Sequence, residues 1–383
     1  MNQEQEYDEF GSKKNDPHAP VNTELRDILL QIMIDNSVSD MYISVGTWAH
    51  VRIRGNITPI NDGIDKLTPE DTKNFVYSIM TIQQRIAFEE RKDLDFAYSM
   101  GEERFRCNCF YQKGTCAAVI RYLPSKMITL DKLNLPPIFE ELTYKHQGII
   151  LVAGPTGSGK STTLTAMLDN VNAKMAKHII TIEDPVEYMH HHKKSIVEAR
   201  EVHTDTASFA AAMKSALRQN PDVVLLGEMR DLESIASAIT IAETGHLVFS
   251  TIHANNSAQC VNKIIDSFGS DQQNQIRLQL SEALCAIISQ RLVPGKDGKS
   301  MVAATEVMIN TGAIGNLIRE SQTHQIESVI QMSRKEGMYL LDDDLERLVL
   351  EDKITPETAL SKCNDYKKMC ARLKINPDEQ GPE

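Results

Sequence analysis

The sequence is poor in aromatic residues and has no excess of positive charge. Phe, Trp and Tyr together make up 5% of the 383 residues, and Trp48 is the single tryptophan. The 53 acidic residues outnumber the 41 lysines and arginines, which leaves a formal net charge of −12. Proteins that bind nucleic acid commonly combine a basic surface with aromatic side chains on which bases stack. Both features count against a DNA-handling motor, and we expect no nucleic-acid partner.

Long apolar runs and paired cysteine motifs are also missing. No segment approaches the ~20 apolar residues of a membrane-spanning helix, and residues 1–16 are too polar and acidic for a signal peptide. The seven cysteines are scattered and odd in number, which fits reduced thiols better than a disulfide framework. Cys107 and Cys109 lie in a strand-like segment and are expected to be buried thiols, because no second pair accompanies them to hold zinc. The sequence therefore predicts a cytoplasmic protein.

A glycine-rich segment stands between an apolar run at 148–153 and a helical pattern at 161–168. It matches the phosphate-binding pattern G-x-x-x-x-G-K-[ST], and strand–loop–helix is the context that this pattern requires. Backbone N–H groups would surround phosphate oxygens, Lys160 would reach the β- and γ-phosphates, and the Ser161 hydroxyl would bind Mg²⁺. We therefore predict binding of ATP with Mg²⁺. The predicted ATP-binding residues are Gly154, Pro155, Thr156, Gly157, Ser158, Gly159, Lys160, Ser161 and Thr162.

The order of apolar segments divides the chain into a smaller first part and a larger second part. Short strand-like and helix-like segments indicate an α+β domain before residue 122, and prolines at 124, 136 and 137 indicate a linker. Beyond it, strands alternate with helices, which predicts an α/β fold with a doubly wound, mostly parallel sheet. The expected parts are a disordered tail (1–20), an N-terminal domain (21–122), a linker (123–137), an ATPase domain (138–310), an all-α tail (311–370) and a disordered end (371–383).

Acidic residues and histidines flank three strand-like segments of the second part. Ligands of open α/β sheets bind at the carboxyl ends of the strands, so we expect these side chains to gather at the phosphate loop. They are Glu183 and Glu187 after 178–182, Glu228 after 223–226, and His246 and His253 on either side of 247–251.

Hydrolysis requires one carboxylate to position or deprotonate the attacking water and another in the magnesium shell. Glu228 takes the place of the magnesium-shell acid that usually follows an apolar strand. Spacing alone leaves the base open among Glu183, Asp184 and Glu187. Ser161, Glu183 and Glu228 are the predicted metal residues.

Four short motifs, listed below as boxes, follow one another in the order in which they occur in the secretion ATPase superfamily. They resemble in particular those of the retraction motors of type IV pili. The resemblance extends over about residues 22–362 and includes Ser39-Asp40, 104–106, 288–292 and 316–320. Assembly ATPases of the superfamily carry two C-x-x-C pairs, so their absence here favours retraction. The boxes are Gly154–Ser161, Ile182–Glu187, Gly227–Asp231 and Gly245–His253.

The resemblance implies residue roles, a fold and partners. It makes Glu187 the catalytic base, Glu228 the Walker-B acid, and His246 and His253 the histidine-box pair. It implies a PAS-like N-terminal domain, a RecA-like ATPase domain and a ring-shaped homo-hexamer. The motor would lie against the cytoplasmic side of the inner membrane, act on the platform protein of the pilus machine, and through it disassemble pilin.

Arginines of the first domain are candidates for stabilising charge on the transferred phosphoryl group. Arg104 and Arg106 share one face of a predicted strand by its period of two, and Arg121 lies on the next predicted strand. Arginine fingers are worth about 10³–10⁵ in rate in other nucleotide hydrolases. The resemblance implies that arginines of this region reach the nucleotide, so the site would be shared between domains and subunits.

Two departures from the retraction pattern leave an alternative open. Gly315 stands where the retraction motors have arginine, and the segment Ala254–Asn256 is more similar to an accessory retraction paralogue. The alternative is thus an accessory ATPase that depends on a paralogous retraction ATPase. A DNA-handling RecA-like motor fits the charge balance poorly. A ring subunit that binds ATP without hydrolysis is disfavoured by the presence of Lys160, Ser161, Glu187 and Glu228.

Overall fold

The computed structural model describes residues 16–36, 38–53, 56–61, 63–123 and 127–375. The expected disorder of residues 1–20 and 371–383 therefore falls largely outside the described residues. At the second of these boundaries, helix α14 (Tyr366–Leu373) continues past residue 370. Within the described ranges, no helix combines the length and the apolar character needed to cross a lipid bilayer.

The chain forms two compact units, Met1–Lys126 and Met127–Glu383. The division falls inside the predicted linker. The later part of that linker belongs to the second unit and contains a 3₁₀ turn, η1 (Leu130–Leu133), whose neighbour is helix α5. Each unit is described by itself below.

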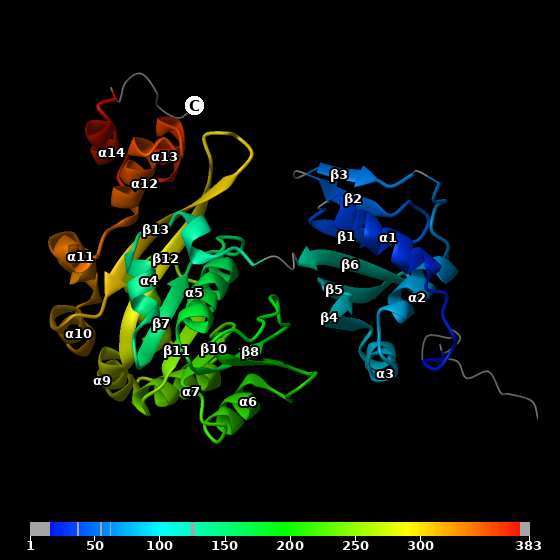
Figure 1. The fold of residues 1–383 in the computed structure, drawn as a ribbon, viewed down its shortest axis with the longest axis horizontal. Coiled ribbons are helices and arrows are strands. Elements are labelled where there is room, and N and C mark those ends of the chain that lie inside the picture. The colour runs from blue at the N-terminus through cyan, green and yellow to red at the C-terminus, as the bar shows by residue number, and fades with distance from the viewer. Residues whose placement is uncertain (1–15, 37, 54–55, 62, 124–126, 376–383) are drawn as a thin grey trace, which may run out of the picture. The chain divides into compact units, whose positions relative to one another are not determined.

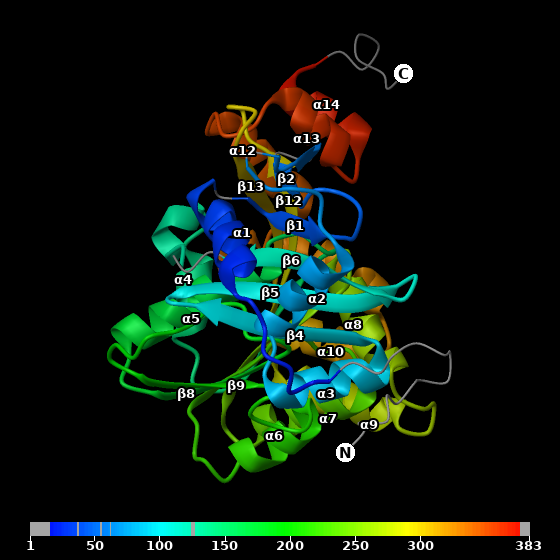
Figure 2. The ribbon, with the colours of Figure 1, turned by 90° about the vertical axis from the view of Figure 1, so that its right-hand side faces the viewer.

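The first unit is an antiparallel sheet in the order β3-β2-β1-β6-β5-β4 with helices on one face (Figures 1 and 2). Leu29 of α1, Phe75 of α2 and Phe88 of α3 pack with Met41 and Ile120 of the strands to form its core. The elements are α1 (Glu24–Asp35), β1 (Asp40–Ile43), β2 (His50–Ile53), β3 (Asn56–Pro59), α2 (Pro69–Ser78), α3 (Ile82–Arg91), β4 (Asp93–Met100), β5 (Glu103–Gln112) and β6 (Thr115–Leu123).

The start of α2 is encoded locally. The side chain of Thr68 accepts a hydrogen bond from the N–H of Asp71, and the Asp71 carboxylate accepts one from the N–H of Thr68. Pro69 occupies the first turn, where its missing N–H costs nothing. Residues 68–71 therefore supply their own cap for this helix.

The second unit has a seven-stranded sheet in the order β13-β12-β7-β11-β10-β8-β9. All neighbouring strands run parallel except β12 and β13. The strands are β7 (Gly148–Ala153), β8 (His178–Glu183), β9 (Ile196–Glu201), β10 (Val223–Leu226), β11 (Leu247–Ile252), β12 (Leu284–Pro294) and β13 (Met301–Ile309). The alternation of strands and helices did not predict β9, β12 or β13, because β9 is a partly exposed edge strand and β12 and β13 are connected without a helix.

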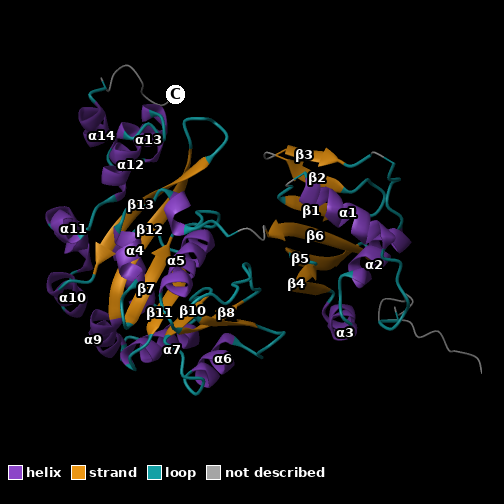
Figure 3. Cartoon of the chain, in the orientation of Figure 1, coloured by secondary structure: helices purple, strands orange, loops and turns teal. Residues whose placement is uncertain are grey.

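Helices cover both faces of this sheet (Figure 3). Ile150 and Val152 of β7 pack with α4 (Ile138–Thr143) and α5 (Lys160–Lys174), whereas Ile149 and Leu151 face the opposite layer. That layer contains α7 (Leu232–Glu243), α8 (Ser257–Asp266) and α9 (Gln273–Ala283), and α6 (Phe209–Ala216) packs on α7. The predicted α/β fold with a mostly parallel, doubly wound sheet is confirmed.

The chain ends in short helices, as the sequence indicates. They are α10 (Gly312–Arg319), α11 (Ile326–Met332), α12 (Leu341–Leu350), α13 (Pro356–Lys362) and α14, with 3₁₀ turns η2 (Thr323–Gln325) and η3 (Arg334–Glu336). Asp344 of α12 accepts a hydrogen bond from the N–H of Thr305 on β13 at 2.7 Å. Asp342 accepts one from the N–H of Asn364 at 2.7 Å. Asp344 thus attaches α12 to the sheet, and Asp342 attaches the segment before α14 to α12.

Candidate ATP-binding and hydrolysis site

The glycine loop joins the fully buried strand β7 to helix α5, as predicted. Gly159 is the N-cap of α5 and has a φ of 83°, a conformation that glycine adopts without steric cost. At Gly154, an added Cβ would lie 2.4 Å from the carbonyl oxygen of Gln290, so a larger residue would have to displace backbone. These positions explain why the loop needs glycine at both ends.

The loop has the features of a phosphate site. No side chain caps the N-terminus of α5, so its first N–H groups and its dipole are available to an anion. The hydroxyl of Ser158 is buried without a hydrogen-bond partner. The Nζ of Lys160 donates to the carbonyls of Gly154 and Pro155 at 3.0 and 2.9 Å. A phosphate group would match these donors, and the residues present therefore fit the predicted nucleotide.

The strand register brings three of the predicted residues to the carboxyl ends of the parallel strands, where the loop lies. The N–H of Gly227, the residue before Glu228, donates at 2.9 Å to the carbonyl of Ile182, the residue before Glu183 at the end of β8. On the other side, Ile252 at the end of β11 pairs with Ala153 at the end of β7, which places His253 next to the start of the loop. Parallel strands thus carry Glu183, Glu228 and His253 to one edge, as expected.

Glu228 lies at the centre of an ion-pair cluster. Its Oε1 is 2.9 Å from Nε2 of His253, and its Oε2 is 2.7 Å from Nε of Arg230. Burial lowers the pKa of Lys160, and the carboxylates of Glu228 and Glu187 act against that shift. The N–H of Glu187 lies 3.4 Å from an oxygen of Glu183. Both candidate acids are therefore within electrostatic reach of the loop lysine.

His246 does not join this cluster, and its predicted convergence on the loop is wrong. Its carbonyl accepts a hydrogen bond from the N–H of Gly148, at the beginning of β7. The six residues of β11 separate it from the phosphate loop, a distance of about 20 Å at ~3.3 Å per strand residue. The Nδ1 of His246 lies 3.0 Å from the carbonyl of Ile241, near the amino-terminal end of β11. Residues at the two ends of one strand cannot share a site in the same subunit.

The three candidate arginines lie on adjacent strands of the first unit. Arg106 of β5 and Arg121 of β6 are direct cross-strand partners. Arg106 pairs with Asp95 at 2.6 Å, and Arg121, with 60% of its side chain exposed, pairs with Asp40 at 2.9 Å. Arg104 approaches the hydroxyl of Ser99 at 3.4 Å. Carboxylates thus hold two of the guanidinium groups while leaving part of their surface accessible.

Comparisons to known proteins agree with this fold. The profile of the family described as type II/IV secretion system protein matches residues 14–355. This chain belongs to that family. The type IV pilus retraction ATPase PilT of Pseudomonas aeruginosa is 44% identical over 335 residues, which is 87% of this chain and 96% of PilT. The type IV pilus ATPase PilU of the same organism is 38% identical over 351 residues, 91% of each chain.

A solved structure described as the pilus retraction motor PilT with bound ADP has the same fold. It superposes with a TM-score of 0.82 at 44% identity and covers 90% of this chain and 98% of its own. The resemblance to secretion ATPases that the four boxes indicated is thereby confirmed.

Sequence reasoning assigned no chemistry to Gln290, although it lies in one of the segments that resemble the family. In this member of the secretion family, Gln290 contacts the phosphate loop from strand β12 and is 2% exposed. Tyr188, next to Glu187, places its hydroxyl 3.3 Å from that of Thr162. A glutamine shortly after the apolar run 284–288 was the signal available in the sequence for Gln290. Nothing in the sequence pointed to Tyr188.

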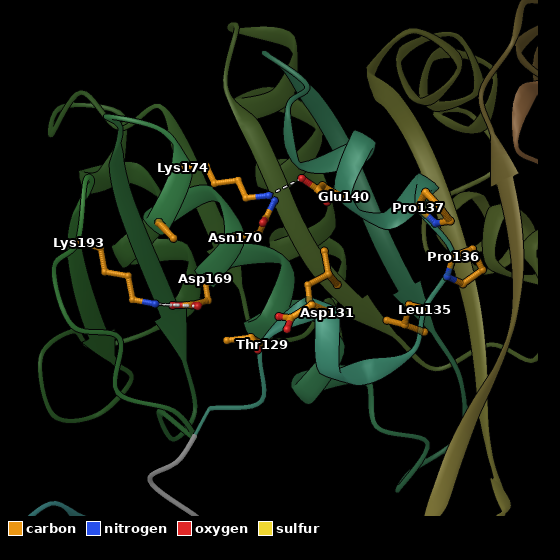
Figure 4. A pocket seen from close by; sticks show the side chains of 12 residues that line it. Thr129, Asp131, Leu135, Pro136, Pro137, Glu140, Asp169, Asn170, Lys174 and Lys193 are labelled. Carbon is orange, nitrogen blue, oxygen red and sulfur yellow. Dashed lines mark hydrogen bonds and ion pairs between the residues drawn. The ribbon is translucent and has the colours of Figure 1, made fainter. Parts of the chain in front are cut away.

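A cavity of ≈ 380 Å³ lies between η1, α4 and α5 and is distinct from the phosphate loop (Figure 4). Its charged side chains pair with one another, since Lys193 lies 2.6 Å from Asp169 and Lys174 bonds Glu140. Lys174 and Lys193, the two lysines that line this cavity, are therefore each paired with a carboxylate.

Proposed function

We propose that the protein is an ATP-hydrolysing motor that powers retraction of type IV pili. The relative at 44% identity is named for this activity and is matched over 96% of its length. The observation that carries the proposal is the combination at one sheet edge of an uncapped α5 N-terminus, Lys160 and the Glu228–His253 pair. This combination supplies a phosphate site and acidic groups for hydrolysis at the same place.

In the proposed mechanism the loop residues 154–162 bind the phosphates through backbone N–H groups and the N-terminus of α5. Lys160 exchanges its bonds to the Gly154 and Pro155 carbonyls for phosphate oxygens. Glu187 accepts the proton of the attacking water, and His253 orients the carboxylate of Glu228.

Magnesium fits the oxygen-rich donors on this edge. Among the residues that the structure describes, no three His, Cys, Asp or Glu side chains form a metal-binding group by themselves. We assign Ser161, Glu183 and Glu228 to the ion's shell together with phosphate oxygens. When bound, Mg²⁺ neutralises charge on those oxygens.

We further propose a site shared between subunits of a homo-hexamer. Arg104, Arg106 and Arg121 would stabilise charge on the γ-phosphoryl group from the first unit of the same or a neighbouring subunit. The partial exposure of the Arg121 side chain supports this, because it can exchange Asp40 for a phosphate. His246 stays a predicted histidine-box residue, and it would act from the amino-terminal end of β11, away from the phosphate loop.

The proposed setting is the cytoplasmic side of the inner membrane. There the hexamer would act on the platform protein of the pilus machine, and on pilin only through it. The names of the relatives support a pilus machine, and the motor character of the solved relative supports mechanical work.

An accessory role that depends on a paralogous ATPase is the second candidate. The observation that favours it is the glycine at position 315, where the retraction motors carry arginine. PilU is 38% identical over 91% of both chains, so it is also a relative over the full extent of the fold. Gly315 is buried in α10, where an added Cβ would lie 3.4 Å from the carbonyl of Ser281 on α9. That distance is an ordinary van der Waals contact, so the Cβ of an arginine, which the retraction motors carry here, would fit at this position.

A gene deletion separates these candidates. Long, numerous and immobile pili in a strain that lacks only this protein support retraction, and absent pili support assembly instead. If a paralogue expressed alone restores twitching fully while this protein expressed alone does not, the accessory role is correct. Stimulation of the ATPase by single-stranded DNA would favour the nucleic-acid motor.

A further inference from the structure

One buried side chain on the neighbouring strand β12 forms a hydrogen bond to the backbone of the phosphate loop. Gln290 of β12 donates from Nε2 to the carbonyl of Ser158 at 2.7 Å. Its Oε1 accepts a hydrogen bond from the hydroxyl of Thr163 at 2.8 Å. One amide thus connects the middle of the loop with the beginning of α5, although Gln290 is more than 120 residues away in sequence.

The bond to Ser158 matters because a phosphate loop has two sides. When its N–H groups point inward at an anion, its carbonyls point outward into the protein, where each needs a donor. Gln290 supplies the donor for the carbonyl of Ser158, a residue that is 3% exposed. Gln290 also lies against both ends of the loop, since a Cβ on Gly159 would lie 2.9 Å from its Nε2.

The residue type fits this task. An amide donates and accepts at the same time, whereas a carboxylate only accepts and a thioether does neither with any strength. Both halves of the Gln290 amide are used, one on the loop and one on α5.

We propose that Gln290 is a positioning residue for ATP binding, which holds the phosphate loop in the conformation that presents its N–H groups to the nucleotide. Gln290 acts through the loop. Its role rests on the proposed function of residues 154–162 as the ATP site and adds a residue that the family boxes do not contain.

The test uses the full chain, four substitutions at Gln290 and Thr163, and one control substitution. Gln290→Met keeps the length and removes both hydrogen bonds, and Gln290→Glu keeps the acceptor for Thr163 but loses the donor for Ser158. Thr163→Val removes the hydroxyl that donates to Oε1 of Gln290, and Thr163→Ser retains this donor. Ile287→Val is the matched control, because it destabilises the same strand without touching the loop.

ATP affinity by equilibrium titration, KM, kcat and the unfolding midpoint without nucleotide are measured for each. We expect Gln290→Met and Gln290→Glu to raise the Kd and KM for ATP about tenfold, the effect of leaving one buried partner unsatisfied. The change in kcat should be much smaller, since the loop binds ground state and transition state alike. Thr163→Val should raise Kd and Thr163→Ser should not, and Gln290→Met combined with Thr163→Val should cost less than the sum of the two.

An unchanged Kd in Gln290→Met would overturn the role. So would an equal rise in Kd for Ile287→Val, because this would show a general effect of stability. If Gln290→Met does not fold, the contrast between Thr163→Val and Thr163→Ser decides the question. Lys160→Ala separates this result from the proposed function: wild-type turnover there overturns the ATP site itself, whereas loss of turnover with normal affinity in Gln290→Met overturns only the role of Gln290.

Discussion

Glu306 is a buried carboxylate that anchors the helix after His253. It lies on β13, is 5% exposed, and accepts hydrogen bonds at Oε1 from the N–H of Ser257 at 2.8 Å and the hydroxyl of Ser257 at 2.6 Å. Ser257 is the first residue of α8. The bonds therefore hold the segment that follows the carboxyl end of β11.

The effect of removing this acceptor can be worked out from the two bonds. Glu306→Leu leaves two buried donors without a partner, each at a cost of about 1–3 kcal/mol. It also removes the cost of burying a charge, so we expect a net loss of about 2–4 kcal/mol. For a unit of this size the unfolding midpoint should fall by about 5–15 °C. Glu306→Gln keeps an acceptor oxygen and removes the cost of burying a charge, so its stability at pH 7 should equal or exceed that of the wild type.

The pH dependence follows from the sign of the pKa shift. Burial raises the pKa of Glu306, and the bonds from Ser257 only partly oppose the shift. The folded state therefore binds this proton more tightly than the unfolded state, whose pKa is about 4.3. The contribution of this group is fully present below the unfolded pKa and is lost as pH rises through the folded pKa. Glu306→Gln lacks this loss, so its advantage over the wild type should grow from pH 4 upward.

Thermal unfolding of the full chain at several pH values tests both parts, with exposed Glu320→Gln as a control for removal of a surface charge. Equal midpoints for Glu306→Leu and Glu306→Gln would refute the importance of the acceptor. A pH-independent difference between Glu306→Gln and the wild type would refute the raised pKa.

Three further outcomes concern catalysis. Lys160→Ala should abolish ATP hydrolysis because the γ-phosphate loses its positive partner, and a phosphate-release assay that finds wild-type turnover contradicts the loop assignment. Glu187→Gln should bind ATP nearly as the wild type does but barely hydrolyse it, whereas the reverse pattern with Glu183→Gln would mean that Glu183 is the base. At least one alanine substitution among the arginines should lower turnover strongly in a protein that still assembles, and full rates in all three would argue against a shared site. The arginines are Arg104, Arg106 and Arg121.

Local sequence determined the features that depend on neighbouring residues. The glycine loop between β7 and α5 has the predicted boundaries, since glycines at both ends and a lysine at the first helical position act over a few residues. The capping pair of Thr68 and Asp71 is similarly short-range. Apolar strands followed by acids predicted the edge at which Glu183 and Glu228 lie, because the carboxyl ends of parallel strands share an edge.

Tertiary structure decided what depends on the order of strands in the sheet. β12 lies beside β7 although more than a hundred residues separate them, and this neighbourhood alone brings Gln290 to the loop. His246 and His253 are close in sequence, yet they lie at the two ends of the extended strand β11. Hydrophobic patterns show which residues are buried but not which strands are neighbours, because the pairing is selected by packing across the whole sheet. The sequence alone therefore predicted the glycine loop and the acids that lie near it, and the folded sheet determined that Gln290 contacts this loop.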